Sequence, residues 1–193
     1  MLNIALFGPP GAGKGTQSER LIAKYGLLYI STGDMLRKEI ASGSDLGKEI
    51  NEVTSQGHLV SDDLIMRIIR KTINSNPHAK GILFDGFPRT LSQAKLLESL
   101  IEELHTRFFG VLSLEVPRQE LIERLINRGK VSGRSDDRED VILERLKEYE
   151  AKTLPVAEYF EKKGNYYPVN GTGSLDEIFE RLVAQIEKHS NLQ

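Results

Sequence analysis

The chain has 193 residues, of which 39% are hydrophobic and 28% are charged, and its net charge at neutral pH is −2. This length suits one α/β domain with small insertions, and the near-neutral charge favours neither nucleic acid nor a membrane surface as a partner. The absence of cysteine excludes disulfide bonds, a cysteine nucleophile and a thiolate zinc site. The chain has neither a secretory signal pattern nor an apolar segment of membrane-spanning length, so we expect a cytoplasmic protein.

Short apolar segments alternate along the chain with longer segments of helical period. The apolar segments span residues 2–7, 26–31, 81–86, 108–116 and 165–170. Helical patterns cover residues 16–24, 33–41, 45–55, 61–74, 90–105, 117–128, 140–163 and 174–189. Two of these patterns begin with capping residues, Ser61 and Thr90. The alternation predicts an α/β fold in which a parallel five-stranded sheet carries helices on both faces.

Two regions interrupt this alternation. Residues 32–80 separate the second and third apolar segments, which is too long for one crossover, so we expect a small helical insertion over residues 31–60. Residues 128–140, RGKVSGRSDDRED, form a charged connection between two helices. Connections of this composition are usually exposed surface loops, and their sequence alone leaves a functional role open.

The first apolar segment leads into GPPGAGKGT, residues 8–16, and then into a helical pattern. Four glycines allow backbone N–H groups to approach phosphate oxygens, and Lys14 adds a positive charge. The usual phosphate-binding loop has a hydroxyl residue directly after its lysine, whereas here Gly15 stands there and the hydroxyl follows at Thr16. The position between strand and helix favours a phosphate-binding loop over an ordinary glycine-rich turn.

The third apolar segment ends at Asp85, and Arg89 follows four residues later. A carboxylate at the end of a strand beside a phosphate loop is typical of a magnesium site, although a strand-end aspartate that caps a turn is the alternative. Arg89 stands where open parallel sheets bind ligands, and a guanidinium group there can bind a second phosphate. An exposed arginine near a helix start is the alternative for Arg89.

An arginine-rich region follows the fourth apolar segment. Its six arginines are Arg118, Arg124, Arg128, Arg134, Arg138 and Arg145. Arg124 and Arg128 are four residues apart and share one helix face. Arginine in preference to lysine is typical of planar recognition of phosphate. Because acidic residues are interleaved, an exposed network of ion pairs is the alternative for any one of these arginines.

Five motifs together match one family. They are GPPGAGKGTQ, STGDMLR (31–37), GHLVSDD (57–63), DGFPRT (85–90) with Gln93, and LxxRLxxR (121–128). In sequence and order they resemble the motifs of the adenylate kinases, P-loop nucleoside monophosphate kinases, along nearly the whole chain. In that family a glycine follows the loop lysine, so Gly15 has the family form.

The resemblance implies an ATP site. Its phosphate-binding residues would be Gly11, Ala12, Gly13, Lys14, Gly15 and Thr16. Arg124 and Arg128 would face the ATP phosphates, and Gly173 in the NGTG turn (170–173) would support the adenine. The implied cofactor is Mg²⁺ bound with ATP, held by Thr16 and Asp85 directly or through water.

The resemblance also implies an AMP site beside the ATP site. Its residues would be Thr32, Arg37, His58, Leu59, Val60, Gly86, Phe87, Pro88, Arg89, Gln93, Arg134 and Arg145. Thr32 and Gln93 would contact the adenine, while Arg37 and Arg89 would bind the phosphate. Arg134 and Arg145 would close over the transferred group. The catalytic set would be Lys14, Asp85, Arg89, Arg124, Arg128, Arg134 and Arg145.

The resemblance divides the chain into a single P-loop kinase core (residues 1–30, 61–128 and 140–193), an NMP-binding insertion (31–60) and a short lid (129–139). Some family members have a longer lid that binds zinc through cysteines. With about eleven lid residues and no cysteine, this chain resembles the short-lid type, and we expect no zinc site.

The expected activity is the reversible, magnesium-dependent conversion of ATP and AMP into two ADP. The four histidines form no acid–base constellation, but a phosphate acceptor is mostly dianionic at neutral pH and needs no base. A UMP/CMP kinase of the same fold is the nearest alternative, and a non-catalytic nucleotide-binding regulator is the other. We expect a monomer whose partners are ATP, AMP and ADP, with no nucleic acid or membrane partner.

Overall fold

The computed structural model describes residues 1–132 and 138–190. Within this part of the chain, five strands form one sheet in which every neighbouring pair is parallel. The strands are β1 (Leu2–Phe7), β2 (Leu28–Ser31), β3 (Gly81–Asp85), β4 (Phe108–Glu115) and β5 (Tyr166–Asn170). Their order is β2-β3-β1-β4-β5, so β1 lies at the centre. The predicted α/β fold with a parallel sheet is confirmed.

Helices connect the strands at the places where helical patterns were predicted. They are α1 (Lys14–Tyr25), α2 (Thr32–Ala41), α3 (Asp45–Thr54), α4 (Asp62–Asn74), α5 (Leu91–Glu103), α6 (Arg118–Ser132), α7 (Glu139–Glu148), α8 (Leu154–Lys162) and α9 (Leu175–Ser190). The Ser61 and Thr90 hydroxyls accept hydrogen bonds from the first turns of α4 and α5, as expected of capping residues. The predicted insertion at 31–60 contains α2 and α3, and its status as a separate moving part stays a prediction.

The predicted short lid, residues 129–139, is described only at its ends. Because α6 continues to Ser132, the first four of these residues are helical. Residues 133–137, which include the expected site residue Arg134, lie outside the described residues. The lid and the role of Arg134 therefore stay predictions.

The single helix expected over residues 140–163 is interrupted by a π-helical turn, η2 (Tyr149–Thr153), between α7 and α8. In this turn the N–H of Leu154 donates to the carbonyl of Tyr149, five residues earlier. Pro155 explains the interruption, because a proline ring inside an α-helix clashes with the carbonyl four residues before it. The wider turn separates these groups and adds one residue to the helix.

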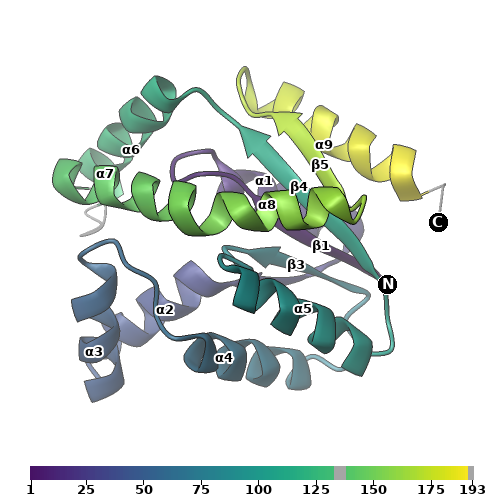
Figure 1. The fold of residues 1–193 in the computed structure, drawn as a ribbon, viewed down its shortest axis with the longest axis horizontal. Coiled ribbons are helices and arrows are strands. Elements are labelled where there is room, and N and C mark those ends of the chain that lie inside the picture. The colour runs from purple at the N-terminus through teal and green to yellow at the C-terminus, as the bar shows by residue number, and fades with distance from the viewer. Residues whose placement is uncertain (133–137, 191–193) are drawn as a thin grey trace.

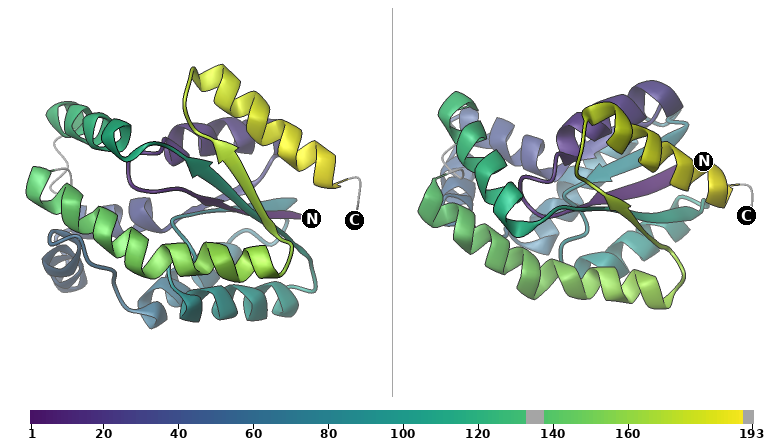
Figure 2. Two further views of the ribbon diagram at one scale, coloured as in Figure 1. Left: turned by 45° about the horizontal axis from the view of Figure 1, so that its top comes forward. Right: turned by 90° about the horizontal axis from the view of Figure 1, so that it is seen from above.

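The sheet is covered on both faces, as Figures 1 and 2 show. Along β1, Ile4 and Leu6 pack in a cluster with α1 and α9, whereas Ala5 and Phe7 pack in a cluster with α4, α5 and α8. All four side chains are buried. Alternating side chains therefore serve two hydrophobic cores, which fixes the central strand and the start of the loop that follows it.

The C-terminal ends of the strands lie on the side of the molecule where α2, α3, α6 and α7 are found, and the N-terminus lies on the opposite side (Figure 1). The register of β1 and β3 pairs Leu6 with Asp85. Since β1 continues into the glycine loop, this pairing places Asp85 beside that loop. Ligands of open parallel sheets bind at such an edge.

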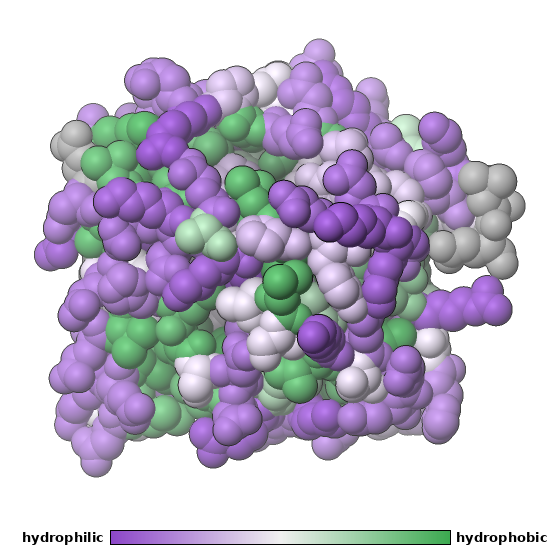
Figure 3. Space-filling view, viewed as in Figure 1, coloured by the Kyte–Doolittle hydropathy of each residue, from purple (hydrophilic) through white to green (hydrophobic). Residues whose placement is uncertain are grey.

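The face of the molecule in Figure 3 is mainly hydrophilic, with small hydrophobic areas scattered among charged side chains. In residues 1–132 and 138–190, no helix has the length and apolar composition needed to span a membrane.

Candidate active site

The glycine loop has the geometry of an anion cradle. Gly11 and Gly13 have φ angles of 85° and 91°, which residues with a Cβ rarely adopt. A Cβ on Gly11 would meet Leu125 at 2.9 Å, whereas one on Gly13 would meet no protein atom within 4 Å. Gly13 precedes α1 without a side-chain cap, so backbone N–H groups of the first turn remain available to a ligand.

Lys14 is the first residue of α1, and its ammonium group is bound within the loop. Nζ donates to the carbonyl of Gly8 at 2.6 Å and to that of Pro9 at 3.1 Å. The pKa of Lys14 is lowered from 10.5 to about 8, mainly by burial and also by nearby arginines, while Asp85 opposes the change. The loop therefore holds an ammonium group whose charged form is destabilised by burial and would be stabilised by a bound anion.

A cleft of about 450 Å³ opens beside the loop. Many predicted site residues line it: Gly11, Gly13, Lys14, Gly15, Thr16, Arg37, Asp85, Arg89, Arg124, Arg128 and Arg145. One lysine and five arginines thus surround one space, against three carboxylates, those of Glu19, Asp34 and Asp85. Such a concentration of cations around a glycine loop suits the several phosphates of a nucleotide pair.

Asp85 and Thr16 fit the expected magnesium site. Both line the cleft, and carboxylate and hydroxyl oxygens are the ligands that Mg²⁺ prefers. The hydroxyl of Tyr29, on β2, donates to Asp85 Oδ2 at 2.8 Å. This bond holds the carboxylate in a fixed orientation and leaves Oδ1 as the other oxygen that can face a metal or its water.

Arg124 connects the glycine loop to the turn at residues 170–173. Its guanidinium donates to the carbonyls of Gly171 at 3.1 Å and Ala12 at 3.5 Å, and pairs with Glu120 at 2.5 Å. Gly173 itself does not line the cleft described here. It belongs to the turn that Arg124 reaches through Gly171, so its predicted contact with adenine stays untested.

A smaller cavity of about 40 Å³ shares Arg89 with the cleft. It is lined by seven of the predicted AMP-site residues, Thr32, His58, Leu59, Val60, Gly86, Arg89 and Gln93. The Thr32 hydroxyl donates to the carbonyl of Gly86 at 2.9 Å. The Gln93 amide donates to Asp62 Oδ1 at 2.8 Å, so this side chain is held by protein contacts as well as facing the cavity.

Arg89 lines both the cleft and the smaller cavity. Its Nε donates to the carbonyl of Gly86 at 2.7 Å, and its backbone N–H donates to Gln93 Oε1 at 2.8 Å. The Thr153 hydroxyl, from the π-helical turn, donates to the backbone carbonyl of Arg89 at 3.0 Å. These contacts fix both the backbone and the guanidinium group of Arg89.

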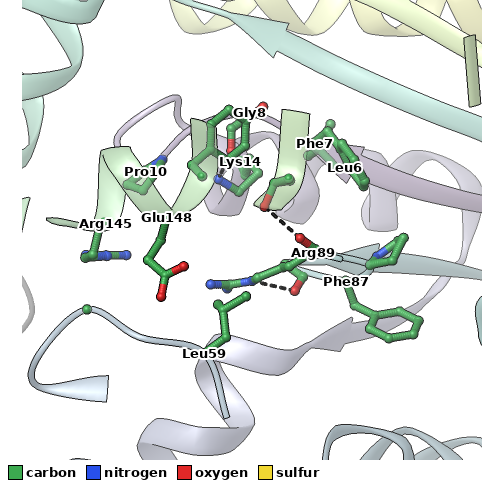
Figure 4. A pocket seen from close by; sticks show the side chains of 15 residues that line it. Leu6, Phe7, Gly8, Pro10, Lys14, Leu59, Phe87, Arg89, Arg145 and Glu148 are labelled. Carbon is green, nitrogen blue, oxygen red and sulfur yellow. Dashed lines mark hydrogen bonds between the residues drawn. The ribbon is translucent and has the colours of Figure 1, made fainter. Parts of the chain in front are cut away.

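A third cavity, of about 80 Å³, is drawn in Figure 4. Phe87 and Pro88, both predicted for the AMP site, line it together with Arg89 and Arg145. In Figure 4 the Glu148 carboxylate lies between the guanidinium groups of Arg145 and Arg89.

Glu148, the last residue of α7, also contacts the predicted insertion. Its carboxylate contacts Nδ1 of His58 at 2.9 Å and pairs with Lys152 at 2.9 Å. Burial alone would raise the pKa of Glu148, but the hydrogen bonds from Lys152 and His58 outweigh it, and the pKa is lowered. Glu148 is therefore held as a carboxylate beside the site.

Three residues near the site, Tyr29, Glu148 and Thr153, were not predicted from the sequence. Tyr29 and Ser31 lie two residues apart in β2, so their spacing on one strand face was the available signal for Tyr29. Glu148 is three residues after Arg145 on one helix face. Thr153 faces the site through the π-helical turn, whose signal in the sequence was Pro155.

Comparison with known proteins identifies one family. The family model described as adenylate kinase matches residues 6–165. An adenylate kinase of Phocaeicola vulgatus is 46% identical over 188 residues, covering 97% of this chain and 100% of that protein. One from Parabacteroides distasonis is 47% identical over 182 residues, covering 94% and 96%, and one from Porphyromonas gingivalis is 46% identical over 188 residues, covering 97% of each.

Proposed function

The chain belongs to the adenylate kinase family, and we propose that it catalyses the reversible transfer of the terminal phosphoryl group of ATP to AMP, forming two ADP. The observation that carries this proposal is the position of Arg89, which lines both the large cationic cleft and the smaller cavity of the acceptor side. A donor in the cleft and an acceptor that extends from the cleft into this cavity would bring their phosphates together at this guanidinium group.

In this reaction an oxygen of the AMP phosphate attacks the terminal phosphorus of ATP, and the bond to the bridging oxygen of the leaving ADP breaks. The acceptor phosphate has a second pKa of about 6, so it attacks as a dianion without a general base. The protein reduces the repulsion between the phosphates and aligns them. Lys14, Arg124 and Arg128 act on the donor, while Arg89 and Arg145 act where the phosphates meet.

We infer that Mg²⁺ accompanies ATP and is held by Asp85 and Thr16, directly or through water. When bound, it would neutralise phosphate charge and bridge the phosphate oxygens of the donor. The side chain of Asp85, oriented by Tyr29, supports this assignment because it brings a carboxylate to the edge of the glycine loop.

We further propose that the insertion at 31–60 and the lid at 129–139 close over the nucleotides and exclude water, which would otherwise hydrolyse ATP. The protein would act as a cytoplasmic monomer on small molecules only. The net charge of −2 supports the last point, since no positive surplus favours nucleic acid or anionic lipid.

The proposal is tested by offering AMP, UMP, CMP and GMP as acceptors with ATP and Mg²⁺. We expect AMP to be turned over with the highest kcat/KM, and a preference for UMP or CMP would refute the choice of acceptor. Arg89→Ala should lose most of the activity while staying folded. Arg70→Ala is the matched control, because Arg70 is an exposed arginine on α4 that pairs with Glu103 outside the site.

A further inference from the structure

We propose that Thr153 is a positioning residue that sets the place of Arg89 and thereby the affinity for the phosphate acceptor. This inference rests on the proposed function. Its basis is Thr153, a residue that is only 6% exposed and whose hydroxyl donates to the backbone carbonyl of Arg89 at 3.0 Å. Figure 4 shows this hydrogen bond together with the one from the Arg89 guanidinium to Gly86.

The π-helical turn is what brings Thr153 to the site. Eight residues of a regular α-helix turn through about 800°, which would leave Thr153 roughly 80° around the helix from Arg145. The extra residue in the turn removes about one 100° step, so that the two side chains lie on nearly the same helix face. Both line the cavity of Figure 4. Pro155 enforces this arrangement, because it does not allow a regular α-helix at this place.

Hydrogen bonds from two separate elements hold the backbone of Arg89. The Arg89 N–H is held by Gln93 of α5, and its carbonyl is held by Thr153 of the π-helical turn. The two peptide units that flank the Arg89 Cα are thus each anchored, and neither can rotate without losing a hydrogen bond. Because the side chain extends from this backbone, the guanidinium group is presented to the acceptor cavity in a defined position.

The test compares Thr153→Val with the wild-type enzyme. The two side chains have nearly the same shape, but valine cannot donate to the Arg89 carbonyl. We expect the KM for AMP to rise about fivefold, as the loss of one net hydrogen bond implies, while the KM for ATP changes little. Thr153→Ser keeps the hydroxyl and should restore the AMP KM. If Thr153→Val does not fold, Thr153→Ala, which leaves space beside the carbonyl, should show the same rise.

Thr72→Val is the matched control. Thr72 on α4 also donates through its hydroxyl to a backbone carbonyl, that of Ile68 at 3.0 Å, but it lies outside the site. This control should leave the AMP KM unchanged even if it lowers the thermal stability. Equal effects of Thr72→Val and Thr153→Val on the AMP KM would overturn the inference.

A second measurement distinguishes the positioning of Arg89 by Thr153 from a general loosening of the protein. If Thr153 acts through Arg89, Thr153→Val should weaken AMP binding in calorimetry with wild-type Arg89 but add little in an Arg89→Lys background. Additive losses would overturn the inference. An active wild-type enzyme whose Thr153→Val variant keeps its AMP KM would overturn this inference alone, whereas a wild-type protein that does not use AMP would overturn the proposed function as well.

Discussion

Lys14 gives a stability prediction that can be worked out from its surroundings. Burial lowers its pKa from 10.5 to about 8. That difference corresponds to about 3 kcal/mol for holding the ammonium group in the folded protein, an upper value because the side chain keeps some contact with solvent. Lys14→Met removes this unfavourable term together with the hydrogen bonds to Gly8 and Pro9. We therefore expect Lys14→Met to lose activity but to be at least as stable as the wild type near neutral pH.

The pH dependence gives the sharper test. Between pH 8 and pH 10.5 the unfolded chain binds a proton at Lys14 that the folded protein has released, so the wild type gains stability relative to Lys14→Met as the pH rises through this window. Below pH 8 Lys14 is protonated in both the folded and the unfolded state, so the difference in unfolding free energy between the two proteins is constant. Urea unfolding of both proteins at about pH 7 and about pH 10 measures the change in this stability difference, which should be about 2.5 kcal/mol.

Taking the difference between the two proteins removes the contributions of groups that titrate alike in both. Lys48→Met controls for the loss of one positive charge, because Lys48 is exposed on α3 and pairs with Asp45. If the unfolding free energies of wild type and Lys14→Met differed by the same amount at both pH values, the reasoning would be refuted. So would a Lys48→Met variant that shows the same dependence on pH.

Two further predictions follow from groups beside the cleft. Tyr29→Phe removes the 2.8 Å bond to Asp85, and we expect the free Mg²⁺ concentration for half-maximal activity to rise about fivefold, measured at saturating ATP and AMP; an unchanged value would contradict the role of Tyr29. The pKa of Glu148 is lower in the folded protein than its ordinary value of 4.5. Its contribution to stability is therefore present above pH 4.5 and is lost as the pH falls through the pKa of the folded protein. Urea unfolding should therefore show that acid destabilises the wild type more than Glu148→Gln.

Much of the fold could be predicted because each face of the sheet is buried. A strand such as β1 must be apolar on both sides, and this leaves short continuous apolar runs that are easy to recognise. The starts of α4 and α5 could be predicted for a different reason. The capping hydroxyls of Ser61 and Thr90 accept hydrogen bonds from backbone N–H groups only three residues later, so the signal is local in the sequence. The π-helical turn was not predicted, although Pro155 stands within the helical pattern, because periodicity averages over an interruption of one residue.

The site could be predicted where a residue acts through its own type and position in a motif. Lys14, Asp85 and Arg89 are of this kind, and the structure brings them to one cleft. Tyr29 and Thr153 act on other residues, through hydrogen bonds that span 56 and 64 positions in the chain. No local pattern encodes such a contact, since it depends on the register of β2 against β3 and on the extra residue before α8.

The helix that runs from α7 through the π-helical turn to α8 touches each part of the proposed reaction centre. Arg145 lines the donor cleft, Glu148 contacts His58 of the predicted insertion, and Thr153 holds the backbone of Arg89. These residues lie within one continuous element, so a shift of the helix changes all three contacts together. Binding energy gained on the acceptor side can therefore act on the group that faces the donor, provided that the helix moves as a unit. The position of the extra residue, between Glu148 and Leu154, decides which side chains share this face.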